Sequence, residues 1–420
     1  MAGDVPGALT DIGTGDHAPA DAAKVAAKDL APAERLFTWP FVAILAMACL
    51  GFGIEVGLRT VLPLVILDRG GDAFAVGVLI TAGTIPSLLF RPFIGRLIDT
   101  WRHDVILRVG ALVLTAGAPL YIGGSLLVLG GARVFQGVGW AMYSVANHAL
   151  MAKLAPPGRR GEASGYYMAM PAIATLVGPA VGVAVYLNAG EAPAIGLTFL
   201  LGIIASVIAF TVAISPRAEP TARRADETGP RPRVLERSSF PSTVMVTTFM
   251  SAQSLFIVFP PIFLTQAGAP LEILTIYYPI YGSAKAIGQL VVGRVSDRLG
   301  RIAPIITGCA IAIAGLAGFF FLDAVPGLFT ASIAYALGMA FAGPAIGALA
   351  IDRAPEGRVG AAMATYTLGY QLATGVSGVL WGAIIAGFGY PWPFVAAAGM
   401  IAVTIAVGLR LSKDSRNQRS

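Results

Sequence analysis

The dominant pattern along the chain is a series of long apolar runs separated by short polar turns. A helix that crosses a bilayer needs about 20 mostly apolar residues. Twelve runs approach or exceed this length, and the sequence therefore predicts an all-α membrane protein. The expected spans are residues 40–65, 75–97, 104–122, 125–152, 162–187, 193–214, 241–265, 271–295, 302–322, 326–352, 358–386 and 391–411.

The twelve runs fall into two sets of six, joined by a polar segment that is rich in Arg and Pro. Such a segment buries too little apolar surface to fold, so we expect it to be a partly disordered connection. The first apolar run is too long and starts too late for a cleaved signal peptide. We predict a disordered cytoplasmic tail (1–39), an N-terminal six-helix half (40–214), a cytoplasmic linker (215–240), a C-terminal six-helix half (241–412) and a short cytoplasmic tail (413–420).

Two turns of the first half recur in the second half. The segment from Gly293 to Arg301 reads GRVSDRLGR, and GRLIDTWR from Gly95 to Arg102 is its weaker copy, at an offset of 198 residues. A second pair, APPGRRGEA from position 155 and APEGRVGAA from position 354, repeats at an offset of 199. Duplicated halves with charged turns between hydrophobic helices are typical of secondary transporters.

Composition and charge agree with a membrane-embedded chain. The chain is 56% hydrophobic and 12% charged, whereas soluble domains carry about 25% charged residues. Nearly all Lys and Arg residues lie in the tails, the linker, the turns after even-numbered spans or the span ends beside them, which predicts that both termini are cytoplasmic. The net charge of +6 is then a topology signal and requires no nucleic-acid partner. Cys49 and Cys309 lie inside apolar runs, which gives no sign of a disulfide framework.

The repeated turns resemble the signature of the major facilitator superfamily, and more closely that of its twelve-helix drug:proton antiporters. The second-half turn carries the G-x-x-x-D-R-x-G-R motif in full, whereas the first-half copy has Thr100 in place of the basic residue. The resemblance implies a major facilitator fold of two pseudo-symmetric halves, in which these turns latch the outward-open state. An ordinary basic turn that only fixes topology is the alternative. The latch residues that the resemblance implies are Gly95, Asp99, Arg102, Gly293, Asp297, Arg298 and Arg301.

The fourth and fifth spans carry two further resemblances to this family. The segment ARVFQGVG, with Arg133 and Gln136, is similar to the motif R-x-x-Q-G-x-G. The fifth span resembles the antiporter motif G-x8-G-x3-G-P-x2-G-G, with Ala174 and Val183 in place of two glycines. The match implies export, although small-residue helix packing would give similar glycine spacings. The matching positions are Gly165, Gly178, Pro179 and Gly182.

Glu55 is the carboxylate that the sequence places firmly inside the membrane, at a depth similar to that of Arg133. In this fold the first and fourth spans line the central path. We therefore predict that Glu55, Arg133 and Arg59 form a protonatable group that couples proton flow to conformation, because intramembrane ion pairs are functional by default. The alternative is that Glu55 simply pairs with Arg59, four residues on, as a helix-surface ion pair.

Lys285 lies 12 residues before Asp297, which places it ~18 Å from that turn in a helix. With Arg59 and Arg133 it gives three bases against one acid at membrane depth, which favours an anionic or zwitterionic substrate. Polar and aromatic residues that could line the substrate path are Gln136, Gln253, Tyr278, Tyr281, Lys285, Tyr366, Tyr370 and Gln371.

The sequence thus predicts a proton-coupled transporter that exports a small organic molecule, a drug or metabolite, by alternating access across the plasma or inner membrane. An importer or exchanger of an organic anion or zwitterion is the alternative. A membrane enzyme is disfavoured, because the chain shows no metal-ligand spacing, nucleophile elbow or phosphate loop. We expect no catalytic residue, metal or cofactor. The expected partners are the small-molecule substrate, protons and the lipid bilayer, around a monomeric protein.

Overall fold

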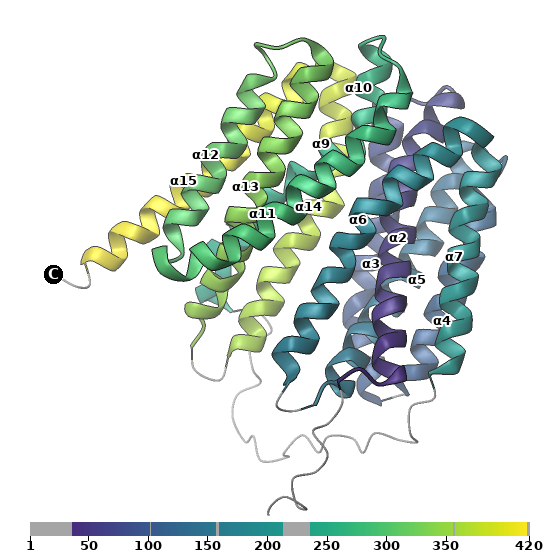
Figure 1. The fold of residues 1–420 in the computed structure, drawn as a ribbon, viewed down its shortest axis with the longest axis horizontal. Helices are drawn as coiled ribbons and strands as arrows, with labels where there is room; N and C mark the ends of the chain where they lie inside the picture. Colours follow the sequence, from purple (N-terminus) through teal and green to yellow (C-terminus); the bar gives the residue numbers. More distant parts are fainter. Residues whose placement is uncertain (1–35, 101, 157–158, 213–235, 356–357, 418–420) are drawn as a thin grey trace, which may run out of the picture.

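The computed structural model describes residues 36–100, 102–156, 159–212, 236–355 and 358–417 (Figure 1). These residues form α-helices and short 3-10 helices, with no β-strand among them. The predicted all-α class is therefore confirmed. The predicted tail up to residue 35 and most of the predicted linker, residues 213–235, lie outside the described residues.

The helices form two groups that stand side by side (Figure 1). The first group contains α2 (Trp39–Asp68), α3 (Ala73–Thr100), α4 (His103–Ala116), η1 (Ala118–Tyr121), α5 (Leu126–Leu154), α6 (Arg160–Ala189) and α7 (Glu191–Thr211). The second group contains η3 (Arg237–Ser239), α8 (Phe240–Ser251), α9 (Gln253–Ile257), α10 (Pro260–Gln266), η4 (Leu271–Ile273), α11 (Leu274–Leu299), α12 (Ile302–Gly318), α13 (Ala324–Asp352), α14 (Val359–Phe388) and α15 (Pro391–Asn417).

Each of the twelve predicted spans coincides with one helix or with a run of consecutive short helices. Among the described residues, eight helices are long and apolar enough to cross a membrane, and a ninth span results if the bent run from Arg237 to Gln266 counts as one. Several boundaries differ from the prediction by a few residues. Helical structure begins at η3, inside the predicted linker, and α15 continues to Asn417.

The seventh span is broken into α8, α9 and α10, and it bends by 54° before α10. A break frees backbone carbonyls, which are costly in an apolar environment unless a donor satisfies them. Side chains of α14, of the turn after it and of α11 supply these donors. Trp381 Nε1 donates to the Ser251 carbonyl at 2.7 Å, and Tyr390 Oη donates to the Phe259 carbonyl at 2.7 Å. Tyr278, which the sequence suggested as a path residue, donates to the Ile257 carbonyl in the same way.

The two faces of the molecule differ in how the groups meet. We call the face where α2 begins at Trp39 the lower face, and the face where α2 ends at Asp68 the upper face (Figure 1). One buried apolar cluster joins the upper parts of the first group to the second group. A second cluster, in the lower part, contains buried residues of the first group alone, from Leu36 to Val212. The apolar core is therefore continuous between the groups near the upper face.

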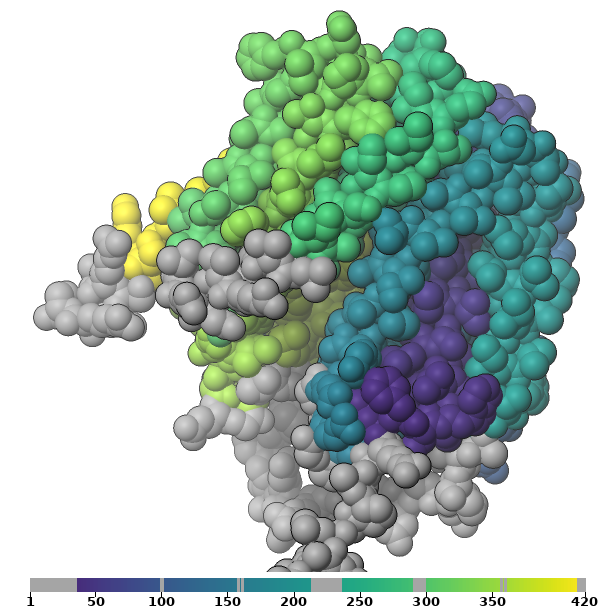
Figure 2. Space-filling view, viewed as in Figure 1, coloured from purple at the N-terminus to yellow at the C-terminus, as the bar shows by residue number. Residues whose placement is uncertain are grey.

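Glycines allow the closest approach between the groups. A Cβ atom built on Gly77 of α3 would lie 2.2 Å from the Gly378 carbonyl oxygen of α14, which no side chain tolerates. One built on Gly282 of α11 would lie 3.0 Å from Leu176 Cα of α6. Figure 2 shows α6 and α11 in contact along the upper part of one face. The backbone N–H of Val379 also donates to Thr81 Oγ1 across the α3–α14 contact, at 3.2 Å.

We expect Gly77→Ala to separate the two groups at the upper face, because the added methyl group would overlap the α14 backbone. Spin labels at Leu127 and Phe388, both strongly exposed, would report the separation after Cys49 and Cys309 are replaced by Ser. The label distance should lengthen. Gly131→Ala on α5 is the matched control, because its Cβ atom would meet nothing within 4 Å. Equal distance distributions in all three proteins would contradict the prediction.

Candidate functional site

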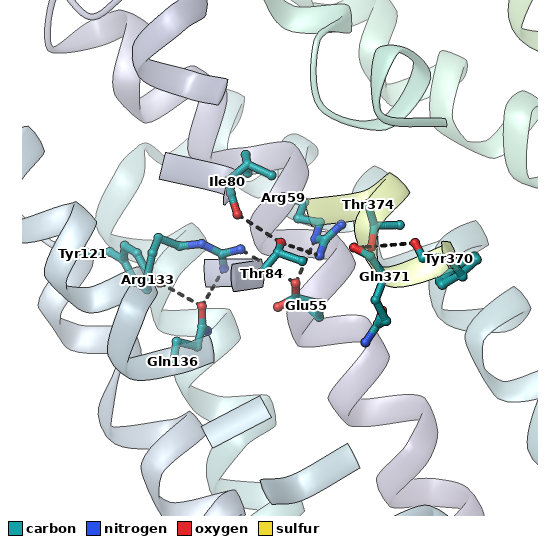
Figure 3. A network of polar contacts seen from close by, with 10 residues as sticks. All are labelled: Glu55, Arg59, Ile80, Thr84, Tyr121, Arg133, Gln136, Tyr370, Gln371 and Thr374. Carbon is teal, nitrogen blue, oxygen red and sulfur yellow. Dashed lines mark hydrogen bonds and ion pairs between the residues drawn. The ribbon is translucent and has the colours of Figure 1, made fainter. Parts of the chain in front are cut away.

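An ion-pair group of one carboxylate and two guanidinium groups lies inside the first group of helices (Figure 3). Arg59 Nε lies 2.8 Å from Glu55 Oε1, one helical turn along α2. Arg133 Nη2, on α5, lies 3.7 Å from the same oxygen. The structure thus brings together the three residues of the predicted coupling group. It also contains the alternative pair, since Glu55 contacts Arg59 and Arg133 at once.

Further hydrogen bonds, through Gln136 and Tyr121, hold the side chain of Arg133 in place (Figure 3). Gln136 Oε1 accepts from Arg133 Nη1 at 2.7 Å and from Tyr121 Oη at 2.8 Å. The side chain of Arg133 is 1% exposed, and Gln136 is fully buried. Gln136 therefore positions Arg133 in this conformation, rather than facing an accessible path as the sequence suggested. Tyr121 was not among the sequence candidates, because its place in the turn before α5 gave no sign of this contact.

The space for Arg133 comes from the close contact between α3 and α5. A Cβ atom on Gly83 would lie 2.7 Å from Arg133 Cζ, so only glycine leaves room for the guanidinium group. A Cβ atom on Gly137 would lie 2.1 Å from the Gly83 carbonyl oxygen. Gly137 belongs to the R-x-x-Q-G-x-G segment. The glycines of this motif and of α3 therefore bring the two helices close enough to hold the arginine between them.

Arg59 connects the ion-pair group to the second group of helices. Its Nη2 atom donates to Thr84 Oγ1 of α3 at 3.4 Å, and a Cβ atom on Gly375 of α14 would lie 3.3 Å from Thr84 Cγ2. Tyr370 and Gln371 of α14 approach the Glu55–Arg59 pair from the other side (Figure 3). The ion pair therefore lies next to the surface on which the two groups meet.

Arg91 on α3 is a site residue that sequence reasoning missed. With the Gln371 amide oriented so that its oxygen faces α3, Oε1 accepts from Arg91 Nε at 2.8 Å and from Nη2 at 3.0 Å. The Ser144 hydroxyl lies 3.5 Å from the same Nη2 atom. The sequence placed Arg91 near the end of its span, where an arginine normally reaches the membrane surface. In the structure it instead joins the two groups of helices.

Lys285 of α11 is half-buried. Among the described residues, no side chain forms a hydrogen bond or ion pair with its ammonium group. It follows Tyr281 by one helical turn, and Tyr281 is 1% exposed. Gly282, three residues earlier, packs on Leu176 of α6. Lys285 is therefore on the part of α11 that lies between the aromatic core of the second group and α6.

The remaining predicted path residues differ in exposure. Gln253 is 7% exposed, and its amide nitrogen lies 3.9 Å from Met339 Sδ. Tyr366, Tyr370 and Gln371 on α14 are half-buried. Among the described residues, no group of three or more His, Cys, Asp or Glu could hold a metal ion.

The latch residues are described only in part. Gly95 lies on α3, and Gly293 belongs to the helical backbone of α11. Arg102 pairs with Asp104 at 2.8 Å, and Arg301 pairs with Asp352 at 2.8 Å, each within its own group of helices. The side chains of Asp99, Asp297 and Arg298 lie outside the described residues. The latch role stays a prediction.

The antiporter-motif residues of α6 pack on α2, the helix that carries Glu55. A Cβ atom on Gly178 would lie 3.3 Å from the Gly53 carbonyl oxygen, and one on Gly182 would lie 3.1 Å from Val61 Cγ2. Pro179 lies between these two glycines inside α6. A Cβ atom on Gly165 would meet nothing within 4 Å. The upper part of the motif therefore sets how closely α6 approaches the helix of the ion pair.

Solved structures with a similar fold are membrane transporters. A nucleoside transporter, NupG, superimposes with a TM-score of 0.71 at 12% identity, over 88% of this chain and 99% of that one. A D-xylose–proton symporter gives a TM-score of 0.69 at 16% identity, over 88% and 95%. A bacterial homologue of the lysosomal transporter Spinster, in an inward-facing conformation, gives 0.67 at 14% identity, over 89% and 96%. At these identities the likeness shows the fold alone.

Two curated proteins are similar over shorter segments. The staphylopine export protein of Staphylococcus aureus is 25% identical over 148 residues, which are 35% of this chain and 37% of that protein. The MFS-type transporter YhhS of Escherichia coli is 40% identical over 70 residues, 17% of each chain. The family model of the Major Facilitator Superfamily matches residues 41–342 and 242–420. The model matches nearly all of the chain after residue 40, and the chain belongs to the Major Facilitator Superfamily.

Proposed function

We propose that this protein is a proton-coupled exporter of a small organic molecule, and that Glu55 carries the proton. The supporting observation is a single buried carboxylate shared by two guanidinium groups, Arg59 at 2.8 Å and Arg133 at 3.7 Å. Ionisable residues inside a membrane protein are expensive and mark ion or proton pathways. Glu55 is 7% exposed, so a change in its charge alters the forces on its neighbours strongly.

The coupling follows from what each charge state of Glu55 does to its neighbours. The ionised carboxylate attracts both guanidinium groups and draws α2 and α5 together. A protonated Glu55 loses most of this attraction, so Arg59 becomes free to change its partner. Arg59 donates to Thr84 at 3.4 Å, and Thr84 packs beside Gly375 of α14. Protonation therefore changes the interactions next to the contact between the two groups, which is where alternating access requires movement.

Two observations support export as the direction of transport. The glycines and proline of the antiporter motif pack α6 on α2, and a relative that is 25% identical over 148 residues is named as a staphylopine exporter.

We place the lower face in the cytoplasm, in the plasma or inner membrane, because Lys and Arg residues gather in the tails and the turns on that side. The apolar core joins the groups near the upper face, which supports an inward-open state within this proposal.

Import or exchange of an organic anion is the second candidate. It is favoured by Lys285, whose ammonium group has no hydrogen-bond or ion-pair partner among the described residues. In proton symport, protonation of Glu55 would again change the contacts of Arg59. The proton and the substrate would then cross the membrane in the same direction, whereas in antiport they cross in opposite directions. The two candidates therefore differ in the direction of proton movement.

Purified protein in liposomes that enclose a pH-sensitive dye tests both candidates. Ethidium and citrate serve as a cationic and an anionic probe, each added outside acid-loaded vesicles. Antiport is expected to release internal protons when a transported compound enters, so the interior becomes more alkaline. Symport would instead carry protons inward with the compound. Compound uptake that is unchanged when a protonophore collapses the pH gradient would contradict proton coupling.

A further inference from the structure

A line of polar side chains follows one face of α3 from the ion-pair group toward the lower face. Thr84, Ser87 and Arg91 are spaced by three and four residues, which places them on the same side of a helix. Thr84 Oγ1 accepts from Arg59 Nη2 at 3.4 Å, and Arg59 Nε lies 2.8 Å from Glu55 Oε1 (Figure 3). The upper end of this line therefore lies beside the proposed proton carrier.

The line lies where α3 packs on α5. A Cβ atom on Gly137 of α5 would lie 2.1 Å from the Gly83 carbonyl oxygen, and Arg91 Nη2 lies 3.5 Å from Ser144 Oγ of α5. Ser87 is four residues after Gly83 and four before Arg91, so it lies on the same face of α3, midway between these two contacts. It is 4% exposed. We call this contact the α3–α5 seam, and Ser87 is buried in its middle.

The hydroxyl group of Ser87 is available to bind water. Although it is buried, it has no hydrogen-bond partner among the described residues. A buried polar group is costly without a partner, and a serine hydroxyl can both donate and accept hydrogen bonds. Thr84 differs, because its hydroxyl donates to the Ile80 carbonyl at 3.1 Å and accepts from Arg59. Between Thr84 and Arg91, Ser87 is therefore the side chain that can hold a water molecule and pass on a proton.

The line continues toward the lower face along α5. Ser144, which contacts Arg91, precedes His148 by one helical turn. His148 is exposed, and its ring meets the Tyr167 ring of α6 edge-on, with 4.9 Å between the centroids. Helix α5 ends shortly afterwards, at Leu154. An exposed imidazole, which can gain and lose a proton near neutral pH, therefore lies at the lower end of the line.

The spacing along the seam matches single water molecules between neighbouring groups. At a rise of about 1.5 Å per residue, Ser87 lies ~4.5 Å along the helix from Thr84 and ~6 Å from Arg91. One bridging water spans about 5.5 Å, which is twice the length of an O–H···O hydrogen bond. Water bound to Ser87 therefore reaches the level of the ion-pair group on one side and the level of Arg91 on the other.

We propose that Glu55 exchanges its proton with the lower face through the α3–α5 seam, and that Ser87 holds the water molecule that relays it. The proposal rests on the proton-coupled function proposed above and adds the path of the proton. The O–H bond of the protonated Glu55 carboxyl group breaks, the water at Ser87 takes this proton and releases another toward the lower face, and the carboxylate remains.

Arg91 has a different part in this path. A guanidinium group stays charged in proteins, so Arg91 orders water in the seam without accepting a proton. Its positive charge also disfavours an excess proton at rest beside it. A proton is therefore held at Glu55 or leaves the seam, and it does not remain between them.

Ser87→Ala is expected to slow proton exchange at Glu55 about tenfold, because the relay loses a hydrogen-bonding group. The pH at which Glu55 is half protonated should not change, since the contacts of Glu55 with Arg59 and Arg133 remain. The full-length protein in nanodiscs receives protons from a caged compound after a laser flash. Infrared absorption follows the protonated carboxyl band that Glu55→Gln lacks. Ser87→Thr keeps a hydroxyl group and should exchange protons at the wild-type rate.

Ser242→Ala is the matched control. Ser242 is also a buried serine whose hydroxyl has no hydrogen-bond partner among the described residues, but it lies on α8 in the second group. The exchange rate should stay at the wild-type value in this variant. A wild-type rate in Ser87→Ala would overturn the path, and so would equal slowing in Ser87→Ala and Ser242→Ala. A shift in the half-protonation pH without a change in rate would show that Ser87 only supports the structure, and this result would overturn the path too.

The same measurement separates the path from the proposed function. A carboxyl band that depends on Glu55 and responds to the flash supports Glu55 as the proton carrier, whatever the result for Ser87→Ala. If the wild type shows no such band at any pH at which it stays folded, proton coupling through Glu55 fails and the path fails with it. A responding band with a wild-type rate in Ser87→Ala removes the path alone.

Discussion

Replacement of Glu55 by Gln is expected to abolish transport driven by a pH gradient and to leave the protein folded. Gln has nearly the same shape and keeps a carbonyl oxygen for Arg59 Nε, which lies 2.8 Å from Glu55 Oε1. It cannot gain or lose a charge, so the group formed by Glu55, Arg59 and Arg133 is fixed in one electrostatic state. Transport against a gradient should fall to the level of empty liposomes. Exchange of substrate between equal concentrations should continue, because it needs movement of the loaded protein alone.

Asp104→Asn is the matched control for Glu55→Gln. Asp104 is also a buried carboxylate, 4% exposed. It also has two guanidinium partners, Arg102 at 2.8 Å and Arg108 at 3.4 Å. Its contacts, however, lie at the lower end of α4, away from the contact between the groups. It should keep pH-driven transport near the wild-type rate at matched reconstitution. Normal accumulation by Glu55→Gln, or an equal loss in both variants, would remove Glu55 from the proposed coupling.

The helices could be predicted from the sequence because lipid imposes a simple rule on the chain. Backbone groups in a bilayer must be satisfied internally, so each apolar run of about 20 residues forms a helix. All twelve runs are helical for most of their length, although the seventh is broken into α8, α9 and α10. The break in that span escaped prediction, because it depends on donors that are distant in sequence. Trp381 and Tyr390, which satisfy the freed carbonyls, lie more than 100 residues from the break.

The depth of the ion-pair group in the membrane could be predicted from the sequence. The full set of residues around it could not. Counting residues from the span ends placed Glu55 and Arg133 at the same level, since the rise per residue of a helix is constant. Counting gives no information about the direction in which a long side chain extends. Arg91 was therefore only one of the basic residues at the span ends, whereas its guanidinium group reaches Gln371 of α14. Gln136 was assigned to the path, whereas it is fully buried and holds Arg133.

The second large effect is expected at Arg133. Arg133→Ala should reduce transport on the order of 100-fold, ~2.7 kcal/mol, and far more than Arg59→Ala does. Both residues contact Glu55, but their surroundings differ. The side chain of Arg133 is 1% exposed and that of Arg59 is 19% exposed. Removing Arg133 leaves a buried space beside Gly83 and takes a donor from Gln136 Oε1. Water or a neighbouring side chain reaches the position of Arg59 more easily.

Arg133→Lys separates the charge of Arg133 from its geometry. Lysine keeps a positive charge for Glu55 but has no planar fork to contact Glu55 and Gln136 at the same time. In the wild type, Nη2 faces Glu55 at 3.7 Å while Nη1 donates to Gln136 at 2.7 Å. If coupling requires both contacts, Arg133→Lys should resemble Arg133→Ala in pH-driven transport, although its thermal stability remains closer to that of the wild type. Initial rates in liposomes at matched protein content decide this. Equal and mild losses in Arg133→Ala and Arg59→Ala would show that Glu55 needs only one nearby positive charge, and that the fixed position of Arg133 has no part in coupling.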